Sequence, residues 1–203
     1  MFNKFRENCP VSVFLILLLC LFTFPFLAGI VPIVRFPSEQ IDIDVFPEFI
    51  VVKGAYVYEN PFPFPVTQGF TIPFHQDPQH PPPVHISATV VSPSIQPVRI
   101  RHIFGKHRFE VTFSPYEQKV VEVSYRQAAP SKCGYYLLRT TKPWRRPLSK
   151  GDYRLMLKGV DLVDSNYPVS QVGHHVFSFS RTDFMPEIDW QWKWRVKQDE
   201  KNT

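Results

Sequence analysis

Four residues within a short stretch of the chain carry side chains that suit metal coordination. They are His75, Asp77, His80 and His85. Imidazole and carboxylate groups suit zinc and copper. In an extended chain His80 and His85 lie ~17 Å apart, so they could share an ion only if the segment folds back on itself. The spacing leaves a copper or zinc site open, while ordinary surface or loop histidines are the simpler interpretation.

Residues for hydrolytic chemistry do not form a recognisable motif. The sequence has no Gly-x-Ser-x-Gly, and Cys133 has no histidine partner close in sequence. Nucleophilic catalysis needs a nucleophile beside a base. The acids late in the chain could pair only in space, and they more often cap turns; they are Asp161, Asp164, Asp183, Glu187 and Asp189. We therefore expect a protein that is not an enzyme and holds no cofactor.

Two groups of aromatic and basic residues are candidates for contact with a protein partner or the membrane interface. They are Trp144, Arg145 and Arg146, and Trp190, Trp192 and Trp194. The first group lies between two prolines and fits a cation–π stack in a turn or contact with anionic headgroups. The second group alternates with polar residues, so a strand would place three indoles on one face. That face either closes the core, which is favoured, or meets a partner or the membrane interface, where Trp is enriched.

An apolar segment near the start of the chain decides where all of these residues would lie relative to a membrane. Val11–Val34 contains no Asp, Glu, Lys, Arg or His, and a helix needs roughly 20 apolar residues to cross a bilayer. The apolar part of a cleaved signal peptide is usually about 7–15 residues and leads to a small-x-small site. This segment is longer and has no such site. A retained transmembrane anchor in contact with lipid is therefore favoured over a cleaved signal peptide.

The charges on either side of this segment predict its orientation. Lys4 and Arg6 precede it, and acidic residues dominate after it. Because Lys and Arg near a membrane segment tend to stay in the cytoplasm, we expect residues 1–10 to be cytoplasmic. Residues 36–197 then form an extracytoplasmic domain, followed by a polar tail at 198–203. The predicted location is the cell membrane, crossed once.

The composition fits one folded domain after the anchor. The chain has 203 residues, 23 Lys+Arg, 18 Asp+Glu and a net charge of +5. The part after the anchor is long enough for a hydrophobic core without disulfides, and Cys133 is its single cysteine. The basic excess is mild and forms no run, so we expect no nucleic-acid partner.

Short alternating apolar runs, separated by Pro, Gly, Ser and Asp, predict strands and turns. The runs are Ile41–Val45, Ile50–Tyr58, Val84–Val90, Val98–His102, Phe109–Phe113, Val121–Tyr125, Tyr135–Thr140, Tyr153–Leu157 and His175–Phe179. Such a series is typical of an antiparallel sandwich or barrel. We predict a mainly β protein, an antiparallel immunoglobulin-like β-sandwich preceded by one N-terminal transmembrane helix.

The segment at residues 60–83 differs from the rest because it mixes proline with phenylalanine. So many prolines disfavour a central strand. We expect an extended loop packed over the sheet by its phenylalanines. It is either a long edge connection, which is favoured, or a loop that covers a ligand or binds a partner.

One stretch resembles a known group of proteins. After Tyr135 the chain reads Tyr-Leu-Leu-Arg-Thr from Tyr136 to Thr140, followed by Trp144 and Pro147. This Tyr-x-Leu-x-Thr and Trp-x-x-Pro pattern resembles uncharacterised exported bacterial β-sandwich proteins, over about a quarter of the chain. The resemblance implies a fold and a compartment, and no activity.

Together these features predict a non-catalytic, membrane-anchored binding or structural subunit of a cell-envelope or membrane complex. Its partners would be lipid, through Val11–Val34, and a protein of the envelope. The alternative is a periplasmic copper- or zinc-binding or hydrolytic protein that uses the histidine-rich stretch.

Overall fold

The computed structural model describes residues 32–197. Residues 1–10, the polar tail at 198–203 and all but the last three residues of the predicted anchor lie outside the described residues. Within the described part, no helix has the length and apolar character needed to cross a membrane.

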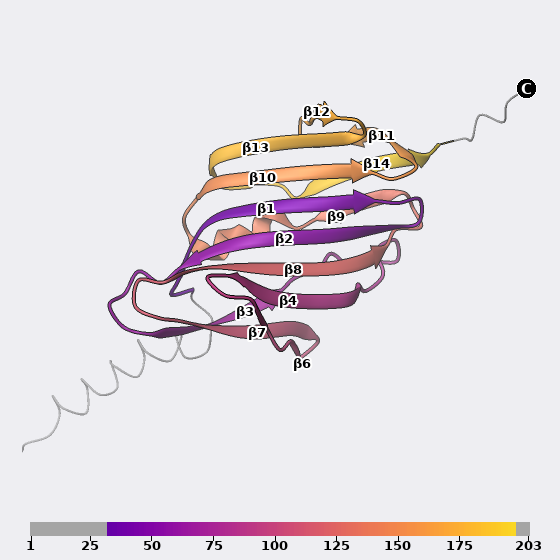
Figure 1. Ribbon diagram of the computed structural model, residues 1–203. Helices are drawn as coiled ribbons and strands as arrows, with labels where there is room; N and C mark the ends of the chain where they lie inside the picture. The colour runs from indigo at the N-terminus through magenta and orange to yellow at the C-terminus, as the bar shows by residue number, and fades with distance from the viewer. Residues whose placement is uncertain (1–31, 198–203) are drawn as a thin grey trace, which may run out of the picture.

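One large sheet forms the front layer of the domain (Figure 1). Its strands, in order across the sheet, are β12 (Ser170–Gly173), β13 (Val176–Phe184), β10 (Leu148–Leu157), β1 (Arg35–Val45), β2 (Phe49–Glu59), β8 (Gln118–Ala128), β4 (Val84–Ser92) and β5 (Gln96–Pro97). Strands β1, β2 and β8 therefore lie at its centre.

Two small sheets lie side by side behind the large one (Figure 1). The first contains β11 (Val160–Ser165), β14 (Trp190–Val196) and β9 (Cys133–Tyr136), and the second contains β3 (Val66–Ile72), β7 (Lys106–Phe113) and β6 (Arg101–Ile103). A 3-10 helix, η1 (Leu138–Trp144), connects β9 to β10. The second layer thus consists of two separate sheets, each with its own edges.

Alternation along each strand explains the layers. In β1, Ile41, Ile43 and Val45 are fully buried, while Asp42 and Asp44 between them point outward, as expected for a strand with one buried face. One core cluster packs the first small sheet on the large sheet, and another packs the second small sheet on it. The core is therefore divided in the same way as the second layer.

The structure confirms a mainly β protein but differs from an antiparallel immunoglobulin-like sandwich. Strand β1 pairs with β10 in parallel, from Ser38 opposite Lys150 to Val45 opposite Leu157. Three open sheets also replace the expected two. The apolar pattern of a strand defines its buried face. Which strand pairs with it, and whether the pair is parallel, depends on long connections such as β9 and η1.

The prediction of an extended loop at residues 60–83 is wrong in part, because the segment contains strand β3. Val66–Ile72 has no proline and alternates strictly: Val66, Gln68, Phe70 and Ile72 are buried, and the residues between them are exposed. Strand β3 lies at the edge of its sheet, so it pairs on one side only. Prolines flanking an edge strand do not interrupt its ladder.

Candidate ligand-binding cavity

A cavity of about 490 Å³ lies between the two small sheets. Strand β3 borders it on one side and β9 on the other, and these two edge strands do not pair with each other among the described residues. Strands β1, β2 and β8 of the large sheet form its floor. Its volume lies within the range of ~300–1,000 Å³ usual for small-molecule sites.

Aromatic rings form much of the cavity wall. The Trp144 ring centroid lies 5.3 Å from that of Phe36 and 5.4 Å from that of Tyr58. The Tyr58 ring in turn lies 4.5 Å from Phe70. These four residues come from η1, β1, β2 and β3, so the wall forms only when both layers are in place.

Phenol groups add polar atoms to the cavity lining. The Tyr56 and Tyr136 hydroxyls share a hydrogen bond of 2.9 Å across the two layers. Burial raises the pKa of both phenols, so both stay neutral and can donate or accept hydrogen bonds.

Glu39 is the single carboxylate among the described residues that line the cavity. Its side chain is 5% exposed, and its Oε1 accepts a hydrogen bond of 2.7 Å from the Tyr153 hydroxyl. Burial raises the pKa of Glu39 to about 7, against the opposing effect of the Tyr153 hydrogen bond. A buried carboxyl facing a cavity is a common mark of a functional site.

Asp189 is a buried carboxylate with a structural role, and its partners differ from those of Glu39. Its side chain is 1% exposed and lies 2.7 Å from the Arg139 guanidinium. The Arg139 backbone N–H and the Tyr135 hydroxyl donate further hydrogen bonds at 2.9 and 3.1 Å. Burial raises the pKa of Asp189, but these bonds outweigh that effect and the pKa is lowered. Among residues 32–197, Glu39 has no comparable set of partners.

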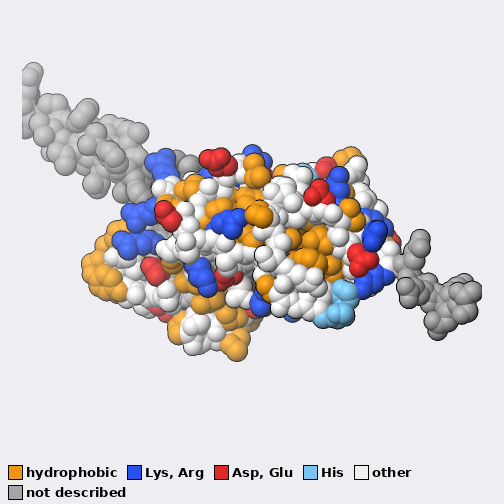
Figure 2. Space-filling model, turned by 90° about the horizontal axis from the view of Figure 1, so that it is seen from above, with side chains coloured by type: hydrophobic (Ala, Val, Ile, Leu, Met, Phe, Trp, Pro, Cys, Tyr) orange, Lys and Arg blue, Asp and Glu red, His pale blue; other side chains and the backbone are white. Residues whose placement is uncertain are grey.

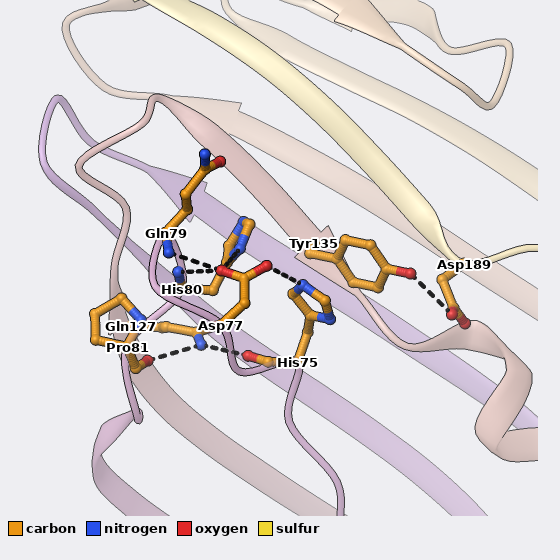
Figure 3. A network of polar contacts seen from close by, with 8 residues as sticks. All are labelled: His75, Asp77, Gln79, His80, Pro81, Gln127, Tyr135 and Asp189. Carbon is orange, nitrogen blue, oxygen red and sulfur yellow. Dashed lines mark hydrogen bonds and ion pairs between the residues drawn. The ribbon is translucent and has the colours of Figure 1, made fainter.

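A histidine loop closes one end of the cavity. We use this name for residues 73–83, which connect β3 to β4. The His75 ring lines the cavity and stacks on the Tyr135 ring of β9, with centroids 3.8 Å apart. The Gln127 side-chain amide donates to the His75 and Pro81 carbonyl oxygens at 2.8 and 3.0 Å. The loop is thus fixed to both layers (Figure 3).

Three of the four predicted metal ligands meet in this loop, as Figure 3 shows. His75 Nε2 and His80 Nδ1 each lie 2.8 Å from a different oxygen of Asp77. The possible ligand atoms lie within 4.8 Å of one another. His85 lies outside this cluster, exposed at the start of β4.

Hydrogen bonds within the loop already satisfy the Asp77 carboxylate. Desolvation would raise the pKa of Asp77, but bonds from the His80 and His75 rings and from two backbone N–H groups lower it. His80 is 7% exposed, and its Nε2 has no hydrogen-bond partner among the described residues. A metal ion would replace the protons that now lie between the imidazole nitrogens and the carboxylate.

The tryptophans separate into two kinds. Trp190, Trp192 and Trp194 are 0%, 1% and 3% exposed and belong to the first core cluster. They are core residues, as the favoured interpretation predicts, and their burial contradicts the alternative of a partner or membrane interface: β14 is the middle strand of its sheet and packs on the large sheet. Trp144 is half-buried in the cavity wall.

Arg145 and Arg146 are exposed just after η1. Arg146 and Trp144 also line a second hollow, of about 550 Å³, together with Arg35 and Glu59. This hollow includes Pro32, where the described chain begins. Figure 2 shows Lys and Arg side chains gathered at that end of the molecule.

Glu39 belongs to no recognisable sequence motif. A signal was present, because Glu39 continues the inward alternation of Ile41, Ile43 and Val45. A charged residue at a core position of a strand indicates either a buried partner or a site. The phenols of β2 and β9 carried no such signal, since tyrosine is common in strands.

Comparisons with known proteins concern the fold alone. No protein-family model matches the sequence. No curated protein matches it. Among solved structures, the chain is similar to a Legionella pneumophila protein described as a "putative nutrient binding protein", with 12% identity and a TM-score of 0.61 over 80% of this chain and 67% of that one. It also matches an M1 zinc metallopeptidase of Deinococcus radiodurans, with 9% identity and a TM-score of 0.46 over 79% of this chain and 42% of that one.

Proposed function

We propose that this protein is a non-catalytic binding subunit of a cell-envelope or membrane complex, and that it binds a small organic molecule in the aromatic cavity. An N-terminal membrane anchor would hold the β domain outside the cytoplasm. The observation that carries the proposal is the cavity itself, with a buried carboxylate and aromatic rings on its lining. Apolar walls with a few placed polar groups are typical of small-molecule sites.

The start of the described chain supports an anchor close to the domain. The Ile33 backbone N–H donates to Gln68 Oε1 at 2.8 Å, and Val34 is buried in the second core cluster. Contacts between the chain and the folded domain therefore begin directly after residue 32. Arg35 and Arg146 at this end would meet anionic headgroups if the preceding segment crosses the bilayer.

A cavity-blocking variant tests the binding function. Val123 of β8 is buried and lines the cavity, so its side chain borders the empty volume and Val123→Trp would place an indole inside it. Val123→Ile, which adds one methyl group and leaves most of the cavity open, is the matched control. Full-length protein is purified from membranes in mild detergent, and compounds released on denaturation are identified by mass spectrometry.

We expect a compound that accompanies the wild type and Val123→Ile and is absent from Val123→Trp. A wild-type protein that carries no compound and binds none from a small-molecule library contradicts the proposal. Protease treatment of spheroplasts tests the anchor separately: the β domain should be digested while the membrane stays intact. Co-purifying proteins would identify the complex.

A second candidate function is copper or zinc binding by His75, Asp77 and His80, which is favoured by their convergence in the histidine loop. Two imidazoles and one carboxylate are a donor set that zinc accepts. Titration of the purified protein with zinc or copper decides the matter. One ion per chain, lost in His75→Ala and retained in His85→Ala, would support it; affinity no tighter than micromolar would reject it.

A further inference from the structure

Glu39 is a buried carboxylate that faces the cavity. Within residues 32–197, no ion pair includes it, although buried Asp189 has Arg139. Its one hydrogen bond comes from the neutral phenol of Tyr153 and goes to Oε1. Burial of an unpaired charge is costly, so buried charges are normally paired.

The cavity is next to Glu39, so a positive charge inside it could pair with this carboxylate. Glu39 lines the cavity, and no hydrogen bond from a described residue reaches its Oε2. A group in the cavity can therefore approach this oxygen without displacing a protein donor. The countercharge for Glu39 can come from a bound molecule.

The rings around this point suit a positive charge. Phe36, Tyr56 and Tyr58 share the cavity lining with Glu39, and the Phe36 ring lies 5.1 Å from Tyr58 and 6.0 Å from Tyr56. Trp144 stacks against Tyr58 at 5.4 Å. Aromatic faces attract organic cations, and the attraction grows when the site is desolvated.

We infer that the ligand of the cavity is an organic cation with an ammonium group, which forms an ion pair with Glu39 while its apolar part packs on the aromatic wall. The inference rests on the proposed binding function and specifies the ligand class. An ammonium group supplies both the missing charge and the hydrogen-bond donors that a carboxylate requires.

The lining disfavours an anionic ligand. Lys106 is the single Lys or Arg among the described lining residues, and it is exposed at the rim. A ligand carboxylate deep in the cavity would meet Glu39 and no cation. Like charges in a desolvated site repel strongly.

Three probes of similar size and shape test the ligand class. Phenethylammonium is cationic, phenethyl alcohol is neutral and hydrocinnamate is anionic. Calorimetric titration of the full-length protein in lipid nanodiscs gives an affinity for each. We expect wild-type protein to bind phenethylammonium most tightly and hydrocinnamate least.

Glu39→Gln keeps the shape of the side chain and removes its charge. We expect it to weaken phenethylammonium binding by about tenfold or more, since a charged hydrogen bond is lost. The affinity for phenethyl alcohol should stay within about threefold, because a neutral ligand loses no ion pair. Val123→Trp, which fills the cavity, should abolish binding of all three probes.

The outcomes separate this inference from the proposed function. Equal or tighter binding of the alcohol or the anion, or a Glu39→Gln variant that binds phenethylammonium as the wild type does, overturns the cation assignment and leaves the cavity as a binding site. No binding of any probe to the wild type also overturns it, and the released-compound experiment then decides on the cavity alone. The probe series on wild-type protein needs no variant to fold.

Discussion

The Tyr153 hydroxyl donates a hydrogen bond of 2.7 Å to Glu39 across the parallel pair of β1 and β10. Gly151, which lies opposite Glu39 in β10, makes this contact possible. A Cβ on Gly151 would lie 2.5 Å from the Tyr153 hydroxyl oxygen, so the phenol occupies the space above the glycine. On the other side of β1, the Tyr56 phenol lies over Gly54 in the same way.

The burial of Glu39 predicts how stability depends on pH. Its folded-state pKa of about 7 exceeds the ordinary value of 4.5, so between these values the folded state binds more protons than the unfolded state. The contribution of Glu39 to the free energy of unfolding is fully present below pH 4.5 and is lost as the pH rises through 7. The total change is about 3 kcal/mol. Denaturant unfolding at pH 5 and pH 9 measures the difference.

Glu39→Gln removes the ionisable carboxyl group, so the free energy of unfolding should change less as the pH rises. The variant should therefore gain stability relative to wild type as the pH rises. Glu122→Gln, which changes an exposed carboxyl on β8 of the same sheet, is the control and should leave the pH dependence in place. If Glu39→Gln and wild type lose stability in parallel between pH 5 and 9, Glu39 is not a buried acid.

Gly151→Ala should break the hydrogen bond without changing either partner. The added methyl group would displace the Tyr153 phenol from above position 151, and the Glu39 carboxylate would lose its donor. We expect a loss of about 1–3 kcal/mol above pH 8, where the carboxylate is charged, and a smaller loss at pH 5.

Tyr153→Phe removes the same donor without adding bulk and should show the same dependence on pH. A loss that is equal at both pH values in both variants would mean that packing, and not the hydrogen bond, is disturbed. The cost of fitting the added methyl group is the difference between the two losses in free energy of unfolding, that of Gly151→Ala and that of Tyr153→Phe.

Asp77 should hold the histidine loop in place. Asp77→Ala removes the acceptor for the His75 and His80 rings and for the Gln79 and His80 backbone N–H groups. We expect faster amide hydrogen exchange at residues 79 and 80 and over the rest of the loop. Because these bonds lower the pKa of Asp77 below its ordinary value, acid should loosen the wild-type loop only as the pH falls through that lowered pKa.

His85→Ala serves as the control for the loop, since His85 lies outside the cluster. Its exchange pattern at residues 79 and 80 should match that of the wild type. Unchanged exchange in Asp77→Ala would show that Gln127, which holds the His75 and Pro81 carbonyl oxygens, fixes the loop by itself.

The layers could be predicted from the sequence better than the site. Strict alternation of apolar side chains identified most strands, including the buried face of β1. The same pattern cannot specify that β1 and β10 run parallel or that the second layer is split. Tyr136 and Trp144 are close in sequence to each other, but Phe36 and Glu39 join them only through the tertiary fold. A cavity built from six strands and a short helix has no local signature.

Local patterns also misjudged single segments. Val98 and Ile100 alternate like strand residues but lie outside any strand, before β6. Tyr135–Thr140 divides into the end of β9 and the start of η1, where Pro143 is accommodated because a short 3-10 turn needs few backbone donors. Both errors arise because apolar periodicity over five or six residues is weak evidence for a strand.

Trp192 tests whether the C-terminal tryptophans belong to the core. Its indole fills the space above Gly134 on the neighbouring β9 and lies 5.0 Å from the Trp190 ring. Trp192→Ala should destabilise the domain by about 3–5 kcal/mol, because the rigid sheets cannot close the space left behind. Denaturant unfolding of the full-length protein measures this loss. Gln191→Ala, on the exposed face of β14, should change stability by no more than about 0.5 kcal/mol. A Trp192→Ala variant that keeps its stability but loses its membrane or partner contacts would restore the interface role that burial argues against.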